Sequence, residues 1–190
     1  GTRMPLFASP SGKYFWPIVL EKAFAKYCGS YEALKGGHSA WAMEAMTGDV
    51  VFKMMRERDG SWRRWDLTVP AQRKSKRDIG LTPTNEAYSV AKVFDILWEY
   101  DRAEALLAAS SEAGADRADN AVRGIVQGHA YSILRLKKVD NFRMVQLRNP
   151  WGDFEWTGNW SDRSTMWQRH PKVAKALGYR TDIADDGGGI

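Results

Sequence analysis

The first half of the chain carries hydrophobic residues at helical spacing. In residues 15–27, FWPIVLEKAFAKY, apolar side chains recur every three or four positions and predict an amphipathic helix. Pro17 suits the first turn of this helix, and Gly29 is a plausible stop. A stronger stripe runs through residues 85–102, NEAYSVAKVFDILWEYDR, which predicts the clearest helix of the chain.

Shorter elements are expected between these two helices. Residues 30–48 predict a short helix, a turn at Gly36-Gly37, and then further helix or loop. DVVFKMM, residues 49–55, is compatible with a strand, and Asp59-Gly60 with a turn. Residues 68–85 are polar and contain two prolines, so we expect a surface loop there.

The hydrophobic pattern changes to a period of two in residues 129–139, HAYSILRLKKV. Both parities of this strand carry apolar residues, so we expect it to be covered on both faces. FRMVQLRN, residues 142–149, predicts a second strand, and Asp140-Asn141 has the chemistry of a hairpin connection. Residues 105–111, ALLAASS, are ambiguous but would fit a buried strand. Helices followed by antiparallel strands indicate an α+β fold.

Composition narrows the class of protein. A length of 190 residues suggests one domain over 1–190, and 44% hydrophobic with 27% charged residues is an ordinary globular balance. No apolar run approaches the roughly 18 residues needed to span a bilayer. Cys28 is the only cysteine, so no disulfide can form within the chain, which favours a reducing, cytoplasmic location.

The net charge of +5 raises the question of a nucleic-acid partner. The densest basic cluster is RKSKR, Arg73 to Arg77. It could contact nucleic acid, but no aromatic residues interleave with it and Asp78 follows at once. We therefore favour a solvated loop and no nucleic-acid partner.

His129 and Asn149 stand at the two ends of the predicted hairpin. Antiparallel pairing brings these ends together although they are 20 positions apart. An asparagine oxygen can accept the imidazole N–H and orient the ring, and the other ring nitrogen can then take a proton from a nucleophile. Pro150 restricts Asn149 to an extended backbone, and Trp151 is large enough to shield the hydrogen bond. The alternative is a structural histidine beside an asparagine in a turn.

Two longer stretches add a resemblance. GHAYS, followed by RNPWGDFEWTGNWSD, and the earlier FWPIVLEKAFAKYCGSYEALKGG resemble the calpain family of intracellular calcium-dependent cysteine proteases. The resemblance implies the second, β-rich subdomain of a papain-like protease core, with His129 as general base and Asn149 as its orienting partner. It also implies that Trp151 shields the pair and that the backbone of Gly128 faces substrate.

The resemblance leaves the nucleophile unaccounted for. In this family the catalytic cysteine lies at a helix N-terminus, where the helix dipole lowers the thiol pKa. Cys28 is expected near a helix C-terminus and is therefore interpreted as a structural residue. The family's cysteine-bearing subdomain lies N-terminal to this region, so it is the expected partner, and this chain alone should not cleave peptides.

Acidic residues after Trp151 suggest a calcium site. Glu155 and Asp162 lie seven positions apart in a tryptophan-rich loop, which alone would indicate only a solvated loop. The resemblance implies calcium ligands at Glu155, Asp162 and Asp186, whereas Gly188 stands where the family has another acid.

Two functions therefore remain open. The parent protein is either a calpain-type endopeptidase that acts on protein substrates, or a calpain-like pseudoprotease that acts as a binding or scaffolding module.

Overall fold

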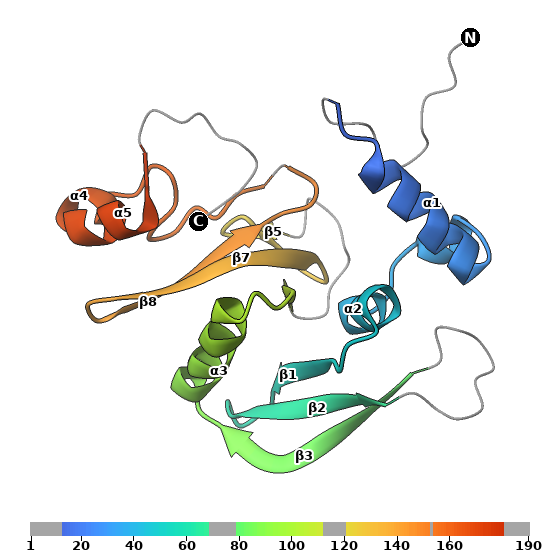
Figure 1. Ribbon diagram of the computed structural model, residues 1–190. Coiled ribbons are helices and arrows are strands. Elements are labelled where there is room, and N and C mark those ends of the chain that lie inside the picture. Colours follow the sequence, from blue (N-terminus) through green and yellow to red (C-terminus); the bar gives the residue numbers. More distant parts are fainter. Residues whose placement is uncertain (1–12, 69–78, 112–120, 153, 181–190) are drawn as a thin grey trace. The chain divides into compact units, whose positions relative to one another are not determined.

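The computed structural model describes residues 13–68, 79–111, 121–152 and 154–180 (Figure 1). The chain divides into two compact units, which are described separately. The first contains Gly1–Met55 and Arg63–Glu86, and the second contains Arg56–Trp62 and Ala87–Ile190. The single domain expected over residues 1–190 stays a prediction.

The first unit opens with the predicted amphipathic helix. Helix α1 spans Trp16–Cys28, with Pro17 in its first turn, and Gly29 ends it in the left-handed region at φ 102°. The ring of Phe24 packs 5.1 Å from the ring of Trp41, which is buried in α2 (Ser39–Thr47). This contact between two aromatic rings anchors α1 to α2.

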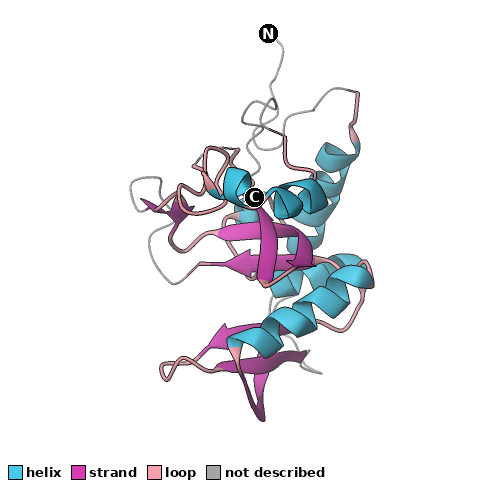
Figure 2. Cartoon of the chain, turned by 90° about the vertical axis from the view of Figure 1, so that its left-hand side faces the viewer, coloured by secondary structure: helices cyan, strands magenta, loops and turns pink. Residues whose placement is uncertain are grey.

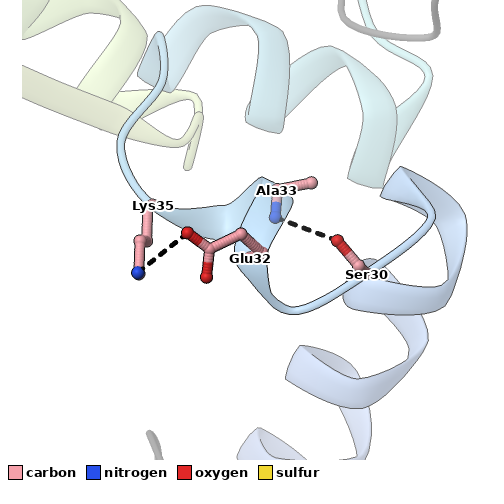
Figure 3. A network of polar contacts seen from close by, with 4 residues as sticks. All are labelled: Ser30, Glu32, Ala33 and Lys35. Carbon is pink, nitrogen blue, oxygen red and sulfur yellow. Dashed lines mark hydrogen bonds and ion pairs between the residues drawn. The ribbon is translucent and has the colours of Figure 1, made fainter.

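The connection between these helices is a single turn of 3₁₀ helix, η1 (Glu32–Leu34). The hydroxyl of Ser30 accepts a hydrogen bond from the backbone N–H of Ala33 at 3.2 Å, which ties the end of the loop to this turn (Figure 3). Lys35 Nζ lies 2.8 Å from Glu32 Oε1. The short helix expected after residue 30 is this turn of 3₁₀ helix, and of the helix or loop expected beyond Gly37 the structure forms the helix α2.

A three-stranded sheet follows, with strand order β1-β2-β3. Its strands are β1 (Phe52–Arg56), β2 (Trp62–Thr68) and β3 (Gly80–Tyr88). The surface loop expected over residues 68–85 is wrong for residues 80–85, which lie in β3. Proline is tolerated there because β3 ends the strand order and Pro83 has no N–H to donate to a further strand.

The helix expected over residues 85–102 is α3, and it begins later than predicted, at Val90–Arg102. Ser89 is its N-cap, and the Ser89 hydroxyl accepts a hydrogen bond from the N–H of Lys92 at 3.2 Å. Residues 85–88 belong to β3 instead, because the cap fixes the helix start.

The second unit is built round an antiparallel sheet of order β4-β7-β8 (Figure 1). Its strands are β4 (Leu107–Ser110), β7 (Ala130–Val139) and β8 (Phe142–Arg148). The elements beside this sheet are a small hairpin of β5 (Ala121–Val122) and β6 (Ile125–Val126), helix α4 (Met166–Arg169) and helix α5 (Pro171–Leu177). Helices and antiparallel strands together confirm the predicted α+β class (Figure 2).

Strand β7 contains a β-bulge at Leu134. Ile133 pairs with Leu147, but the next paired residue, Arg135, is opposite Gln146, so Leu134 is an extra residue on β7. The bulge explains why apolar residues occur at both odd and even positions of this strand. Beyond the extra residue, the positions that face a given side change from even to odd. Leu134 itself is 47% exposed.

Coverage of β7 therefore differs along its length. On one face Lys138 reaches α3, with Nζ 2.7 Å from Asp95 Oδ1 and 4.0 Å from the ring centre of Trp98. The hydrogen bond from Lys138 lowers the pKa of the Asp95 carboxyl below its usual value. Leu136 has the parity of Lys138, is 1% exposed, and its N–H donates to Asp101 Oδ2 at 3.0 Å.

The opposite face is covered only near the turn. Here Val139 packs against a core that joins β8 to α4 and α5, made of Met144, Trp167, Val173 and Leu177. At the other end of the strand Ala130 and Ser132 are exposed. Coverage of both faces is thus confirmed at the turn and wrong at the end that bears His129.

Among the described residues, no helix has the length and apolar character needed to cross a bilayer.

The bulge predicts very different costs for two neighbouring leucines. Leu136→Ala should lower the free energy of unfolding by about 2–5 kcal/mol, because it opens a cavity in a close-packed core. Leu134→Ala should change it by only about 0.5 kcal/mol, since that side chain is partly in solvent. Urea unfolding followed by circular dichroism measures both, and equal losses would contradict the assignment of the bulge.

Candidate active site

His129 and Asn149 meet at the open end of the β7–β8 hairpin. His129 immediately precedes β7 and Asn149 immediately follows β8. His129 Nε2 lies 2.8 Å from Asn149 Oδ1, and the two residues are 4% and 5% exposed. The hydrogen bond predicted from the hairpin is confirmed.

The bulge at Leu134 is what places these two side chains on one face. If β7 had no extra residue, the pairing that starts at the turn would place Asn149 opposite Ser132. His129 would then point to the opposite face of the sheet from Asn149. With the extra residue, Ser132 pairs with Arg148. Asn149 then shares its face with Tyr131, and so with His129 two positions earlier.

The surroundings of Asn149 determine which ring nitrogen of His129 carries hydrogen. Asn149 Oδ1 also accepts the backbone N–H of Trp151 at 3.0 Å, and Asn149 Nδ2 donates to the carbonyl of Phe154 at 3.4 Å. Both contacts identify Oδ1 as the acceptor. Nε2 is therefore the donor, and Nδ1 is the basic nitrogen of the neutral ring.

Aromatic rings enclose the imidazole on two sides. The ring of Trp151 lies 4.3 Å from the His129 ring at 47°, and Tyr131 presents its edge at 5.0 Å and 89°. Trp151 remains 42% exposed, so one side of its ring faces solvent while the ring contacts the imidazole. The shielding role expected of Trp151 stays a prediction.

Gly128, expected to face substrate through its backbone, immediately precedes His129. It has φ 68°, a left-handed conformation that glycine adopts without a steric penalty. The turn at Gly128 lets the chain reverse into β7 after the β5–β6 hairpin.

Sequence reasoning missed Ser111. The Ser111 hydroxyl accepts the backbone N–H of His129 at 3.0 Å, and the Ser111 N–H donates to the carbonyl of His129 at 3.0 Å. A serine at the end of a predicted strand carries no signal of such a role, because its partner is 18 positions away.

Cys28 lies where the helix pattern predicted. It is the last residue of α1 and is half-buried, at the end of the helix where the dipole does not favour a thiolate. Cys28 belongs to the first unit, whereas His129 and Asn149 belong to the second.

The other two histidines differ from each other. His38 is exposed in the loop before α2. His170 is in a loop between α4 and α5 but is packed, with its ring 4.7 Å from that of Phe142.

The acidic residues form an incomplete ligand set. Glu155 and Asp162 are both half-buried in the loop after Trp151, and the Asp162 carbonyl accepts a hydrogen bond from the hydroxyl of Tyr179. The described ranges contain no group of three or more metal-ligating side chains. Asp186 and Gly188 lie outside the described residues, as does the basic cluster at residues 73–77.

Comparison with known proteins identifies the family. Residues 2–188 match the family described as calpain family cysteine protease. The chain is 36% identical over 170 residues to the calpain-type cysteine protease DEK1 of Zea mays, covering 88% of this chain and 7% of that protein.

Animal relatives give similar values. Calpain-5 of Mus musculus is 33% identical over 196 residues, covering 94% of this chain and 27% of that protein. Calpain-8 of Mus musculus is 36% identical over 166 residues, covering 84% of this chain and 19% of that protein. The chain thus spans a small part of these relatives, and it belongs to the calpain family of cysteine proteases.

Proposed function

We propose that this chain supplies the histidine and asparagine of a calpain-type cysteine endopeptidase, and that a cysteine-bearing subdomain preceding it supplies the nucleophile. The observation that carries this proposal is the buried hydrogen bond of 2.8 Å between His129 Nε2 and Asn149 Oδ1. A histidine oriented by an acceptor on one nitrogen is suited to remove a proton with the other.

In the proposed reaction, His129 Nδ1 takes the proton of the partner's thiol, and the thiolate attacks the carbonyl carbon of a peptide bond. The imidazolium then protonates the leaving amine as the C–N bond breaks, which leaves a thioester. A water molecule then attacks the thioester carbonyl while His129 takes its proton. The C–S bond breaks, the acid product leaves, and the thiolate is restored beside the protonated imidazole. The substrates are therefore proteins or peptides.

Asn149 contributes orientation and not charge in this proposal. Its amide holds Nε2 as the donor through both steps, so the ring need not change tautomer. Trp151 limits the access of water to this hydrogen bond, which strengthens it because the local dielectric is low.

A second candidate is a non-catalytic member of the family that binds or scaffolds other proteins. The observation in its favour is that Cys28, the only cysteine in the sequence, stands at the C-terminal end of α1. The His129–Asn149 hydrogen bond favours the enzyme, because it orients the imidazole as a general base requires.

We also propose that Asp186 completes a weak calcium site with Glu155 and Asp162. The support is the resemblance of this loop to the family's acidic loop. The described residues alone fall short, because two carboxylates do not provide the six to eight oxygens that calcium takes. No step of the proposed reaction passes through the ion.

The chain by itself should show no peptidase activity, with or without calcium. Its only thiol lies at a helix C-terminus, which does not stabilise the thiolate. Cleavage of casein by the purified chain measures this, with Cys28→Ser as the control. Thiol-dependent cleavage that disappears in Cys28→Ser would refute the assignment of Cys28.

A chimera that joins a cysteine-bearing calpain half to this chain should cleave peptides. His129→Ala should lower its kcat by about 10²–10⁴-fold, because the base is lost. Asn149→Ala should lower kcat by less, since the imidazole remains but is no longer oriented. The matched control is Asn85→Ala, an exposed asparagine in β3, which should leave kcat unchanged. An Asn149→Ala chimera with unaltered kcat would remove Asn149 from the proposed machinery.

Calcium binding is tested by titration calorimetry. Wild type should give a weak binding heat at millimolar calcium, and Glu155→Gln with Asp162→Asn should give none, because two charged ligands are lost. Asp140→Asn, an acid in the β7–β8 turn, is the control and should bind as wild type does. Equal heats for wild type and the double variant would show that these two acids are not ligands.

A further inference from the structure

The small hairpin β5–β6 contacts the two segments that matter most for the candidate active site. At one end it is bonded to the residues that hold His129, and at the other it lies against the segment Phe154–Thr157. Nothing in the proposed reaction uses this hairpin, so its contacts call for a separate explanation.

The first set of contacts fixes Val126, the last residue of β6. Its side chain is fully buried, and its N–H donates to the hydroxyl of Tyr131 at 2.8 Å. Its carbonyl accepts the hydroxyl hydrogen of Ser111 at 2.6 Å. Tyr131 lies edge-on against the His129 ring, so the position of Val126 affects that ring through one intervening side chain.

Ser111 joins the same carbonyl to the backbone of His129. Its oxygen accepts the His129 N–H at 3.0 Å while its hydrogen goes to Val126. The carbonyl of His129 is also 3.3 Å from this oxygen, but one hydroxyl hydrogen serves the shorter bond of 2.6 Å. Ser111 therefore connects the end of β6 directly to His129.

The second set of contacts is at the turn of the hairpin, Arg123-Gly124. The Arg123 carbonyl accepts the N–H of Thr157 at 3.0 Å. A Cβ atom built on Gly124 would overlap the carbonyl oxygen of Glu155, so only glycine permits this approach. Arg123 has φ 51°, a left-handed conformation that costs free energy in a non-glycine residue and that the tight turn imposes.

The segment Phe154–Thr157 also reaches the partner of His129. The Phe154 carbonyl accepts Asn149 Nδ2 at 3.4 Å. One short segment is thus bonded to Asn149 directly and is connected to His129 through the hairpin. A displacement of this segment would move both ends of the His129–Asn149 hydrogen bond.

We propose that the hairpin Ala121–Val126 is a positioning element. It connects the backbone of Glu155–Thr157 to His129, and so fixes where His129 lies relative to Asn149. Ser111 and Gly124 are its positioning residues. For its effect on catalysis this inference rests on the proposed function, but the geometry that it describes does not depend on the chain being an enzyme.

Nitrogen-15 NMR of the histidine side chains tests the proposal on the full chain, without any activity. The imidazole shifts and the Nε2–H signal of His129 report its tautomer and its hydrogen bond to Asn149. His38 and His170 provide internal references, because His38 precedes α2 and the ring of His170 packs against Phe142 and Trp160.

Two substitutions, each with a matched control, separate positioning from stability. Ser111→Ala should shift the His129 resonances and weaken the Nε2–H signal, whereas Ser110→Ala, the exposed serine beside it, should not. Ser111→Thr keeps the hydroxyl and should restore the wild-type spectrum.

Gly124→Ala should also shift the His129 resonances, because the added methyl group displaces the segment at Glu155. Gly178→Ala is its control. Gly178 has a similar φ of 66°, but a Cβ there meets nothing within 4 Å. The Gly178→Ala variant therefore has the backbone strain without the collision. It should lower stability and leave His129 unchanged.

Several outcomes would overturn the proposal. Unchanged His129 resonances in folded Ser111→Ala would show that the serine does not position the ring. A shift in Ser111→Ala with none in folded Gly124→Ala would refute the link to Glu155. If Gly124→Ala fails to fold, the same measurement is made on Thr157→Pro. This variant removes the N–H that bonds to the Arg123 carbonyl. A chimera without peptidase activity would count against the proposed function alone.

Discussion

One inserted residue decides whether the candidate active site exists. Side chains alternate between the faces of a strand, so His129 shares a face with Asn149 only if the register of β7 shifts by one position. Leu134 provides that shift inside β7, between the turn and the site. The bulge also explains the exposure of Leu134 and the burial of Leu136. The site and the core beneath it therefore depend on the same irregularity.

The second requirement is a full set of partners for two buried polar side chains. Burying an amide and an imidazole costs free energy unless their hydrogen-bonding groups are satisfied. Asn149 meets this by accepting from His129 and from Trp151 while donating to Phe154. Its side chain thereby orders the chain that follows β8, and Trp151 is held over the imidazole as a result.

The sequence predicted the elements whose signals are local. The stripe of α1 and the period of two in β7 are local signals of this kind. The connection at Asp140-Asn141 was sufficient to bring together the strand ends that carry His129 and Asn149, but not to place both side chains on one face. The bulge was not predicted, because an extra residue leaves only a mixed pattern of parities. Strand β3 was missed since Pro83 and its polar neighbours read as loop, and only its place at the end of the strand order explains them. Ser111 and Gly124 act through contacts far apart in sequence, which no local pattern encodes.

The turn of the β7–β8 hairpin lies at the opposite end of both strands from the candidate active site. Its two residues, Asp140 and Asn141, are not paired in the ladder, which closes at Val139 and Phe142. Extra residues placed between them would lengthen a surface loop without changing which side chains face each other. This turn is therefore a suitable insertion point for an affinity tag or a fluorescent label, because a foreign peptide there leaves the register of the sheet intact.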